Sequence, residues 1–195
     1  MIVRDMIEQA NLLATGSKSA VSASQQAKTL MIANLLQRDW QDEVFSQPDK
    51  RWNSLKQTAT ISLSQDTHYN LESGFLGIVH RSDFKINDQV VAPVYNIRNS
   101  QIIFDSKFVK ENTDKTLTYE FYRELEPLSD LGQTIQIDNP NWLVYMVAGE
   151  LVRPDPVMGH QYANLIAMAQ SAMQSMKRRD AIAKIPDKMQ VRRLR

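Results

Sequence analysis

The side chains that most often serve acid–base, metal or nucleophilic chemistry are few and scattered in this chain. The three histidines (His68, His80 and His160) stand twelve and eighty residues apart, without the HExxH pattern or another paired-ligand spacing. The chain has no cysteine, which excludes a thiol nucleophile, a disulfide framework and cysteine-ligated zinc. The spacing of the histidines and the absence of cysteine therefore predict no metal site.

Phosphate-binding and nucleophile motifs are also missing from the sequence. The six glycines form neither GxGxxG nor GxxxxGK followed by Ser or Thr, and no GxSxG pattern occurs. Neighbouring carboxylates, at Asp42-Glu43 and at Glu124 and Glu126, are more typical of a solvated face than of an acid/base dyad. We predict that the protein is not an enzyme and binds no cofactor.

Composition and charge describe a globular chain with a basic tail. The content of 43% hydrophobic and 23% charged residues excludes global disorder, and 195 residues suit one domain with an inserted subdomain. No apolar run approaches the ~18 residues of a membrane span, and Arg4, Asp5 and Glu8 interrupt any signal peptide. From residue 177 to 195, eight Lys/Arg and two Asp give +6, so residues 1–176, with fifteen basic and twenty acidic residues, carry −5. The tail is expected to meet an acidic partner; a solvated, frayed terminus is the alternative.

Residues 1–45 have helical periodicity. Gly16-Ser17 interrupts it, and Ser22 with Gln25 forms a capping box that begins a second helix, roughly Ala23 to Trp40. The apolar residues of this helix lie on two sides, with Ala27, Met31 and Leu35 on one and Ile32, Ala33, Leu36 and Trp40 on the other. A helix that is apolar on two sides is buried on two sides, and we expect the second burial to be against another subunit.

Residues 46–137 alternate with a period of two, which is typical of antiparallel strands with one wet face. The clearest strands contain Ala59, Ile61 and Leu63, and Leu117, Tyr119 and Phe121. Shorter candidate strands are Phe75–Val79, Val90–Ile97, Gln101–Phe104 and Thr134–Ile137, with a hairpin turn at Asn99-Ser100.

Helical signals return after residue 137. Asn139 can cap a helix that has Pro140 in its first turn and reads NPNWLVYMVAGELVR, apolar on every side but with Glu150 inside it. After Pro154, Asp155-Pro156 repeats the cap-and-proline pattern and begins a final amphipathic helix, and residues from Ile185 onward have no periodicity. Its stripe comprises Tyr162, Leu165, Ile166, Ala169, Ala172, Met173 and Met176. Helical zones on either side of a strand zone predict an α+β fold.

The serial order of these features resembles one protein family. It comprises a V-x-x-M-I/L helix, a Leu/Met-rich helix ending at Trp40, the strand ATISL leading to Tyr69-Asn70-Leu71, and a strand with Tyr119 and Tyr122. Then comes a P-x-x-L/W-x-x-x-A-A/G-E-L helix, matched by Pro140, Trp142, Ala148, Gly149, Glu150 and Leu151. Over residues 2–183 the chain resembles the head–tail adaptor (neck or connector) proteins of short-tailed bacteriophages, of the tail-tubular-A kind. It departs from them at Glu72, where a proline is usual.

The resemblance implies a helical bundle of residues 1–45 and 138–183, a β-rich lobe of residues 46–137 inserted in it, and an extended C-terminal arm of residues 184–195. The helix from Asn139 to Arg153 would be the enclosed member. Glu150 would then pair with a basic residue of a neighbouring helix, in the same or the next subunit; a solvated position at the helix end is the alternative. The residues expected in core or oligomer packing are Leu36, Trp40, Trp142, Tyr145 and Glu150.

The family's role, carried over, is a ring of about twelve copies below the portal of the capsid. It would extend the DNA channel without sequence-specific contact and carry a downstream tail or nozzle protein and tail fibres, in a virion assembled in the host cytoplasm. The basic arm would dock into the portal, with arginines forking onto carboxylates. The arm residues are Lys184, Ile185, Lys188, Val191, Arg192, Arg193, Leu194 and Arg195.

A nucleic-acid-binding protein that neutralises phosphates with the same basic tail is the alternative. No helix-turn-helix, RNA-recognition or zinc module is recognisable, and the aromatic residues do not interleave with the basic ones.

Overall fold

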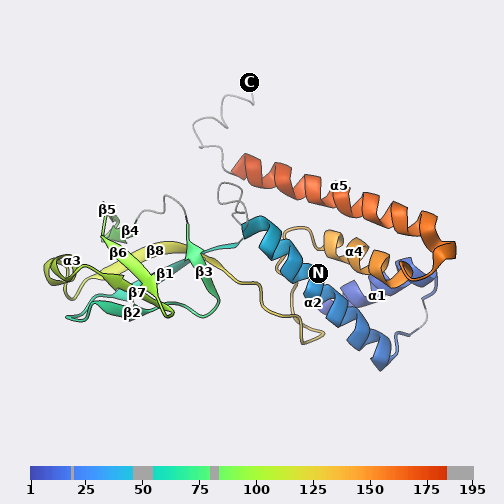
Figure 1. Cartoon of the computed structure of the whole chain (residues 1–195), viewed down its shortest axis with the longest axis horizontal. Helices are drawn as coiled ribbons and strands as arrows, with labels where there is room; N and C mark the ends of the chain where they lie inside the picture. Colours follow the sequence, from blue (N-terminus) through green and yellow to red (C-terminus); the bar gives the residue numbers. More distant parts are fainter. Residues whose placement is uncertain (19, 46–54, 80–83, 184–195) are drawn as a thin grey trace, which may run out of the picture. The chain divides into compact units, whose positions relative to one another are not determined.

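The computed structural model describes residues 1–18, 20–45, 55–79 and 84–183 and has the predicted α+β fold (Figure 1). The chain divides into two compact units, Met1–Gln47 with Leu125–Arg195, and Pro48–Glu124. The predicted lobe, residues 46–137, therefore ends too late, because residues 125–137 belong with the helices. The predicted arm, residues 184–195, lies outside the described residues.

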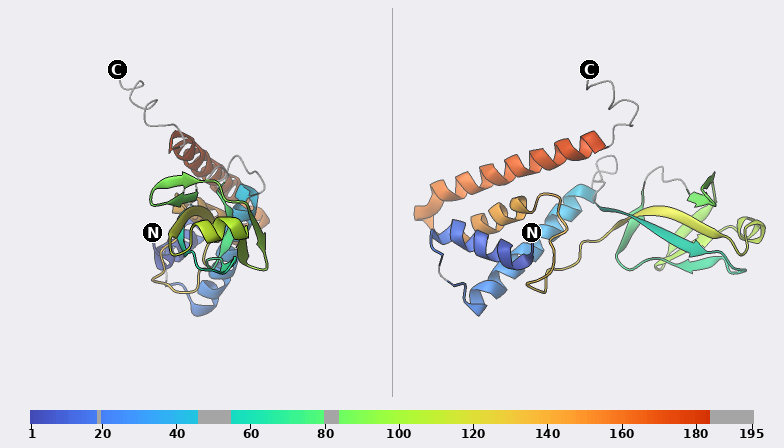
Figure 2. Two further views of the ribbon diagram at one scale, coloured as in Figure 1. Left: turned by 90° about the vertical axis from the view of Figure 1, so that its left-hand side faces the viewer. Right: turned by 180° about the vertical axis from the view of Figure 1, so that it is seen from behind.

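The helical unit contains α1 (Val3–Thr15), α2 (Ala23–Phe45), α4 (Pro140–Val152), the short η3 (Pro156–Met158) and α5 (Gly159–Ala183). Helix α4 contacts α1, α2 and α5, and Figure 1 and the right-hand view of Figure 2 show α5 on one side of it and α1 and α2 on the other. Seven of its thirteen residues are buried, which agrees with the apolar sequence around the whole helix.

The predicted helix boundaries come from short-range signals, and most of them are confirmed. Gly16 ends α1 in the left-handed region, at φ 69°. At the start of α2 the Gln25 N–H donates to Ser22 Oγ (3.3 Å), and the Ser22 N–H donates to Gln25 Oε1 (3.0 Å). The Asp155 carboxylate accepts from the Val157 N–H (2.9 Å). Asn139 occupies the N-cap position of α4 with Pro140 in the first turn, as predicted, but its side chain makes no capping hydrogen bond.

The β unit consists of two antiparallel sheets that pack across a common core. In one sheet β8 (Thr116–Arg123) pairs with β1 (Lys56–Ser62), β3 (Phe75–Ile78) and β4 (Phe84–Ile86), and β4 pairs with β5 (Gln89–Val91). The other sheet has the order β2 (His68–Asn70), β7 (Gln101–Phe104), β6 (Tyr95–Arg98), and α3 (Ser106–Glu111) follows β7. The core contains Ile61, Leu63, Phe84, Ile102, Phe104, Leu117, Tyr119 and Phe121.

The strand predictions succeed where the alternation is regular and fail elsewhere. The two clear predictions correspond to β1 and β8, which pair from Lys56↔Tyr122 to Ser62↔Thr116. Asn99 and Ser100 form the predicted hairpin turn, both at positive φ (51° and 58°) as a two-residue type I′ turn requires. The predicted strand Val90–Ile97 is two strands, because Pro93 lies between β5 and β6 and cannot donate to a ladder. Thr134–Ile137 is not a strand and makes only a single bridge, from Thr134 to Ile2.

Candidate functional site

Two tryptophans that the sequence analysis selected meet in the centre of the helical unit. Trp40 of α2 and Trp142 of α4 are 2% and 7% exposed, and their ring centroids lie 6.4 Å apart at an interplanar angle of 47°. Leu36 and Tyr145, which were predicted beside them, are half-buried. The pair fixes one face of α2 against α4, since large aromatic rings bury much of the area in a core.

Two turns further along α4, the helix packs closely against α5 at a glycine. A Cβ atom added to Gly149 would lie 3.3 Å from Ile166 Cδ1 and 3.8 Å from the Tyr162 ring, so this position favours a residue without a side chain. The N-terminal end of α5 is held separately, because Gln161 Nε2 donates to the Leu13 carbonyl at the end of α1. Both contacts orient α5 along the bundle.

Glu150 does not have the partner that was expected for a buried carboxylate. Its side chain is 27% exposed and accepts from Nη1 of Arg153, at 3.3 Å to each carboxylate oxygen, and Arg153 follows the last residue of the same helix. Within the described part of the chain, the partner of Glu150 is therefore at the end of its own helix and not on a neighbouring one, and the alternative, a position near the exposed helix end, describes Glu150 in the single chain better. The Arg153 side chain is 64% exposed, and exposed pairs of this kind contribute little stability.

Helix α2 has one buried and one exposed apolar side. Ala33 and Trp40 are buried, and Ile32 and Leu36 are half-buried against the unit. On the other side Met31 and Leu35 are 58% and 56% exposed, and Ala27 is also exposed. We call Ala27, Met31 and Leu35 the α2 stripe. The sequence analysis expected one of the two apolar sides to pack against another subunit but did not specify which.

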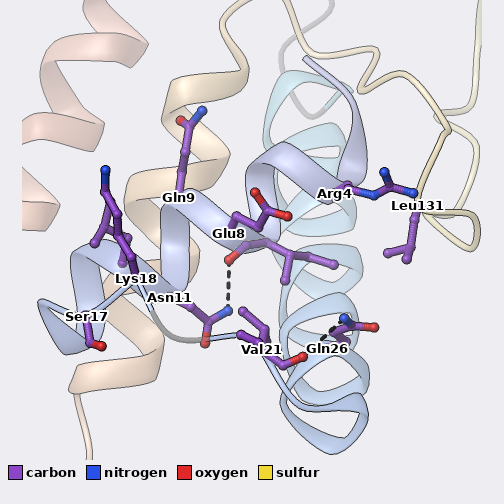
Figure 3. Close-up of a pocket in the computed structure, with 12 residues that line it drawn as sticks. Arg4, Glu8, Gln9, Asn11, Ser17, Lys18, Val21, Gln26 and Leu131 are labelled. Atoms are coloured by element: carbon purple, nitrogen blue, oxygen red, sulfur yellow. Dashed lines mark hydrogen bonds between the residues drawn. The ribbon is translucent and has the colours of Figure 1, made fainter.

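A cavity of about 610 Å³ lies between α1, the connection to α2, and α2 itself (Figure 3). Its charged lining residues are Arg4, Glu8 and Lys18, and the Arg4 and Lys18 side chains lie at opposite ends of the view in Figure 3. Inside it, Asn11 Nδ2 donates to the Ile7 carbonyl (2.8 Å), so this amide is used within the fold. The lining residues include no His, Cys or Asp.

The two histidines in the described ranges are not brought together in one unit. His68 on β2 and His160 on α5 are exposed and belong to different units, and His80 lies outside the described residues. No group of three or more His, Cys, Asp or Glu in the described part of the chain could hold a metal ion. Burial, and after it the negative charge of Glu72, raises the pKa of Tyr119 in the β core to about 12.

The eight predicted arm residues, Lys184 to Arg195, lie outside the described residues. Among the helices that the structure describes, none is long and apolar enough to cross a membrane. A comparison of the chain with protein-family models finds no match, and a comparison with curated proteins finds none either.

Proposed function

We propose that this protein is a structural protein of the virion of a short-tailed bacteriophage, a head–tail adaptor. Copies of it form a ring below the portal, extend the DNA channel and join the tail components to the capsid. The proposal starts from the family resemblance and is supported by the arrangement of the chain, in which helices from both ends build one unit and a β unit is inserted between them.

The observation that carries the proposal is the α2 stripe. Met31 and Leu35 are more than half exposed on a helix whose other apolar side is buried or half-buried in the unit. An apolar stripe of this length on a helix surface marks an interaction site more often than a solvated face. In an adaptor, lateral contacts between copies cover such a stripe, and no chemistry is required of the protein.

The second element of the proposal is the basic tail. Residues 177–195 carry +6 and the rest of the chain −5, so the tail suits an acidic groove on the portal. Arginine binds carboxylates in a bidentate manner, and Arg192 and Arg193 are the residues we assign to this contact.

Deleting Ile185–Arg195 tests the docking role, because it removes Lys188, Arg192, Arg193 and Arg195 but none of the apolar stripe of α5. The truncated protein should fold, and phage carrying the truncation should yield capsids that lack the adaptor and leak DNA. Charge reversal at Arg192 and Arg193 should have nearly the same effect. Reversal at Lys107 and Lys110, two exposed residues of α3, is the matched control and should leave assembly intact.

The same variants separate the adaptor from a DNA-binding protein. If the tail binds nucleic acid, truncation should reduce the retention of duplex DNA in a filter-binding assay, to an extent that depends on the salt concentration, and portal attachment should be intact. Co-sedimentation of the truncated protein with the portal at wild-type levels would contradict the docking role.

A further inference from the structure

Helix α5 has an outward face without charge. Between Asp155 and Lys177 the chain contains no Asp, Glu, Lys or Arg, although much of this stretch is exposed. The exposed residues include Ala163, Asn164, Ala167, Met168, Ser171 and Gln174, and Met168 is 43% exposed. The opposite side of the helix, with Leu165, Ala169 and Met176, is buried in the unit. We call the six exposed residues the α5 face.

This absence of charge distinguishes the α5 face from an ordinary solvated helix surface. Exposed helix faces usually carry charged side chains, whereas the centres of protein interfaces are depleted of them. Where α5 continues beyond this stretch, the exposed residues Lys177, Arg178 and Arg179 return to the ordinary pattern. The neutral part of the helix is therefore the part that suits a partner.

The α2 stripe is similar in character and in length. Ala27 to Leu35 and Ala163 to Ser171 are each nine residues of helix, about 12 Å from the first Cα to the last at the helical rise. Charged side chains border the stripe, at Lys28 and at Arg38, but its centre at Met31 and Leu35 is apolar. Each of these two surfaces suits an uncharged helical partner surface. The α2 stripe and the α5 face, both present in this chain, meet this requirement for one another.

The two surfaces cannot meet within one copy. Helix α4 contacts both α2 and α5 and lies between them in Figure 1 and in the right-hand view of Figure 2. Because each of the two outer helices buries one side in the unit, we infer that their exposed sides face outward on opposite sides of it. Surfaces on opposite sides of a subunit give a heterologous contact, in which each copy uses one surface for each neighbour. Such a contact generates a ring when the rotation closes.

We infer that the α2 stripe of one copy packs against the α5 face of the next copy. This inference rests on the proposed ring and names the two surfaces that build it. Burial of Met31, Leu35 and Met168 supplies the apolar area, and the absence of charge on the α5 face avoids the desolvation penalty that a charged helix would impose.

The absence of native cysteine allows a direct test by cross-linking. Met31→Cys and Ala167→Cys are prepared singly and treated with a short bifunctional maleimide at high protein concentration. Each variant alone should remain a single chain, their equimolar mixture should give dimers, and the double variant should give a ladder of multimers. Gln9→Cys, at an exposed position of α1, replaces either partner as the matched control and should give no product.

Three results would overturn the inference. Dimers from Met31→Cys alone would indicate that two α2 stripes meet about a two-fold axis, and dimers from Ala167→Cys alone would indicate the same for α5. The absence of product from the mixture would show that the surfaces do not meet. The Leu35→Cys variant with Met31→Asp added gives an independent check. Its mixture with Ala167→Cys should lose the dimers that Leu35→Cys without Met31→Asp gives in the same mixture, while the circular dichroism spectrum is unchanged.

The outcome is separable from that of the proposed function. Phage that carry Met31→Asp with Leu35→Asp and still assemble normal particles would contradict the interface but not the adaptor. If the arm truncation does not affect portal attachment, the docking role of the adaptor is contradicted. The cross-linking pattern still tests, independently, whether the α2 stripe meets the α5 face.

Discussion

The side-chain amide of Asn34 binds both backbone groups of Leu128. Its Oδ1 accepts from the Leu128 N–H at 2.7 Å, and its Nδ2 donates to the Leu128 carbonyl at 2.9 Å. The same side of α2 continues the pattern, since Gln37 Nε2 donates to the Glu126 carbonyl (2.9 Å) and Gln41 Oε1 accepts from the Leu125 N–H (2.7 Å). Three amide side chains thus bind backbone N–H and carbonyl groups of segment 125–128 that a neighbouring strand would bind in a sheet.

Asn34→Ala should lower the free energy of unfolding by about 1–3 kcal/mol, because two backbone groups of the buried Leu128 lose their partner. Asn34→Asp should also destabilise the protein, because it keeps the acceptor but sets a carboxylate oxygen against the Leu128 carbonyl in place of the donor. Urea unfolding followed by circular dichroism measures both. Asn96→Ala, at an exposed position of β6, is the control. Equal midpoints for Asn34→Ala and the wild type would mean that the amide contributes nothing.

Trp142→Ala should lower the free energy of unfolding by about 3–5 kcal/mol, since it leaves a cavity next to Trp40 in the enclosed part of the unit. Trp40→Ala and the double variant complete a double-mutant cycle. The double variant should cost less than the sum of the two single changes, because the rings are in contact. An unchanged melting temperature for Trp142→Ala would contradict the enclosure of α4.

Glu150→Gln should change the free energy of unfolding by less than about 1 kcal/mol, because Arg153, its partner, is largely exposed and the pair spans a single helical turn. Arg153→Gln should have an equally small effect. Thermal unfolding at low and at high salt is the measurement. A loss of several kcal/mol from Glu150→Gln would indicate that the carboxylate is buried, as the sequence analysis first proposed.

Alkaline pH should destabilise the β unit through Tyr119. The folded state raises the pKa of this phenol from 10.0 to about 12, so it holds the proton more tightly than the unfolded chain does. The contribution of this group to stability is therefore complete below pH 10 and is lost as the pH rises toward 12. Tyr119→Phe should remove this part of the pH dependence. Denaturation midpoints between neutral pH and pH 11 measure it, with Tyr95→Phe, whose ring is 40% exposed, as the control. A pH dependence that Tyr119→Phe leaves unchanged would contradict the assignment.

The sequence by itself determined the features that depend on a few neighbouring residues. Gly16 at the end of α1, the Ser22–Gln25 capping box and the Asn99-Ser100 turn were all predicted. Their chemistry is contained within one turn of the chain, so no distant segment can change it. The period-two pattern of β1 and β8 was predicted for the same kind of reason, because one face of each strand must be buried wherever the strand lies.

Only the tertiary structure decided which distant segments meet. The side-chain amides of α2 bind backbone groups of residues 125–128. No local sequence pattern predicts a contact between segments so far apart in the sequence. Residues 134–137 alternate like a strand, yet they form only a single β-bridge, between Thr134 and Ile2 near the N-terminus. Glu150 has an apolar sequence environment, but the end of α4 leaves it partly exposed beside Arg153. Burial and pairing depend on what packs against a segment, and that is a property of the folded chain, since local propensity is a weak prior that tertiary context overrides.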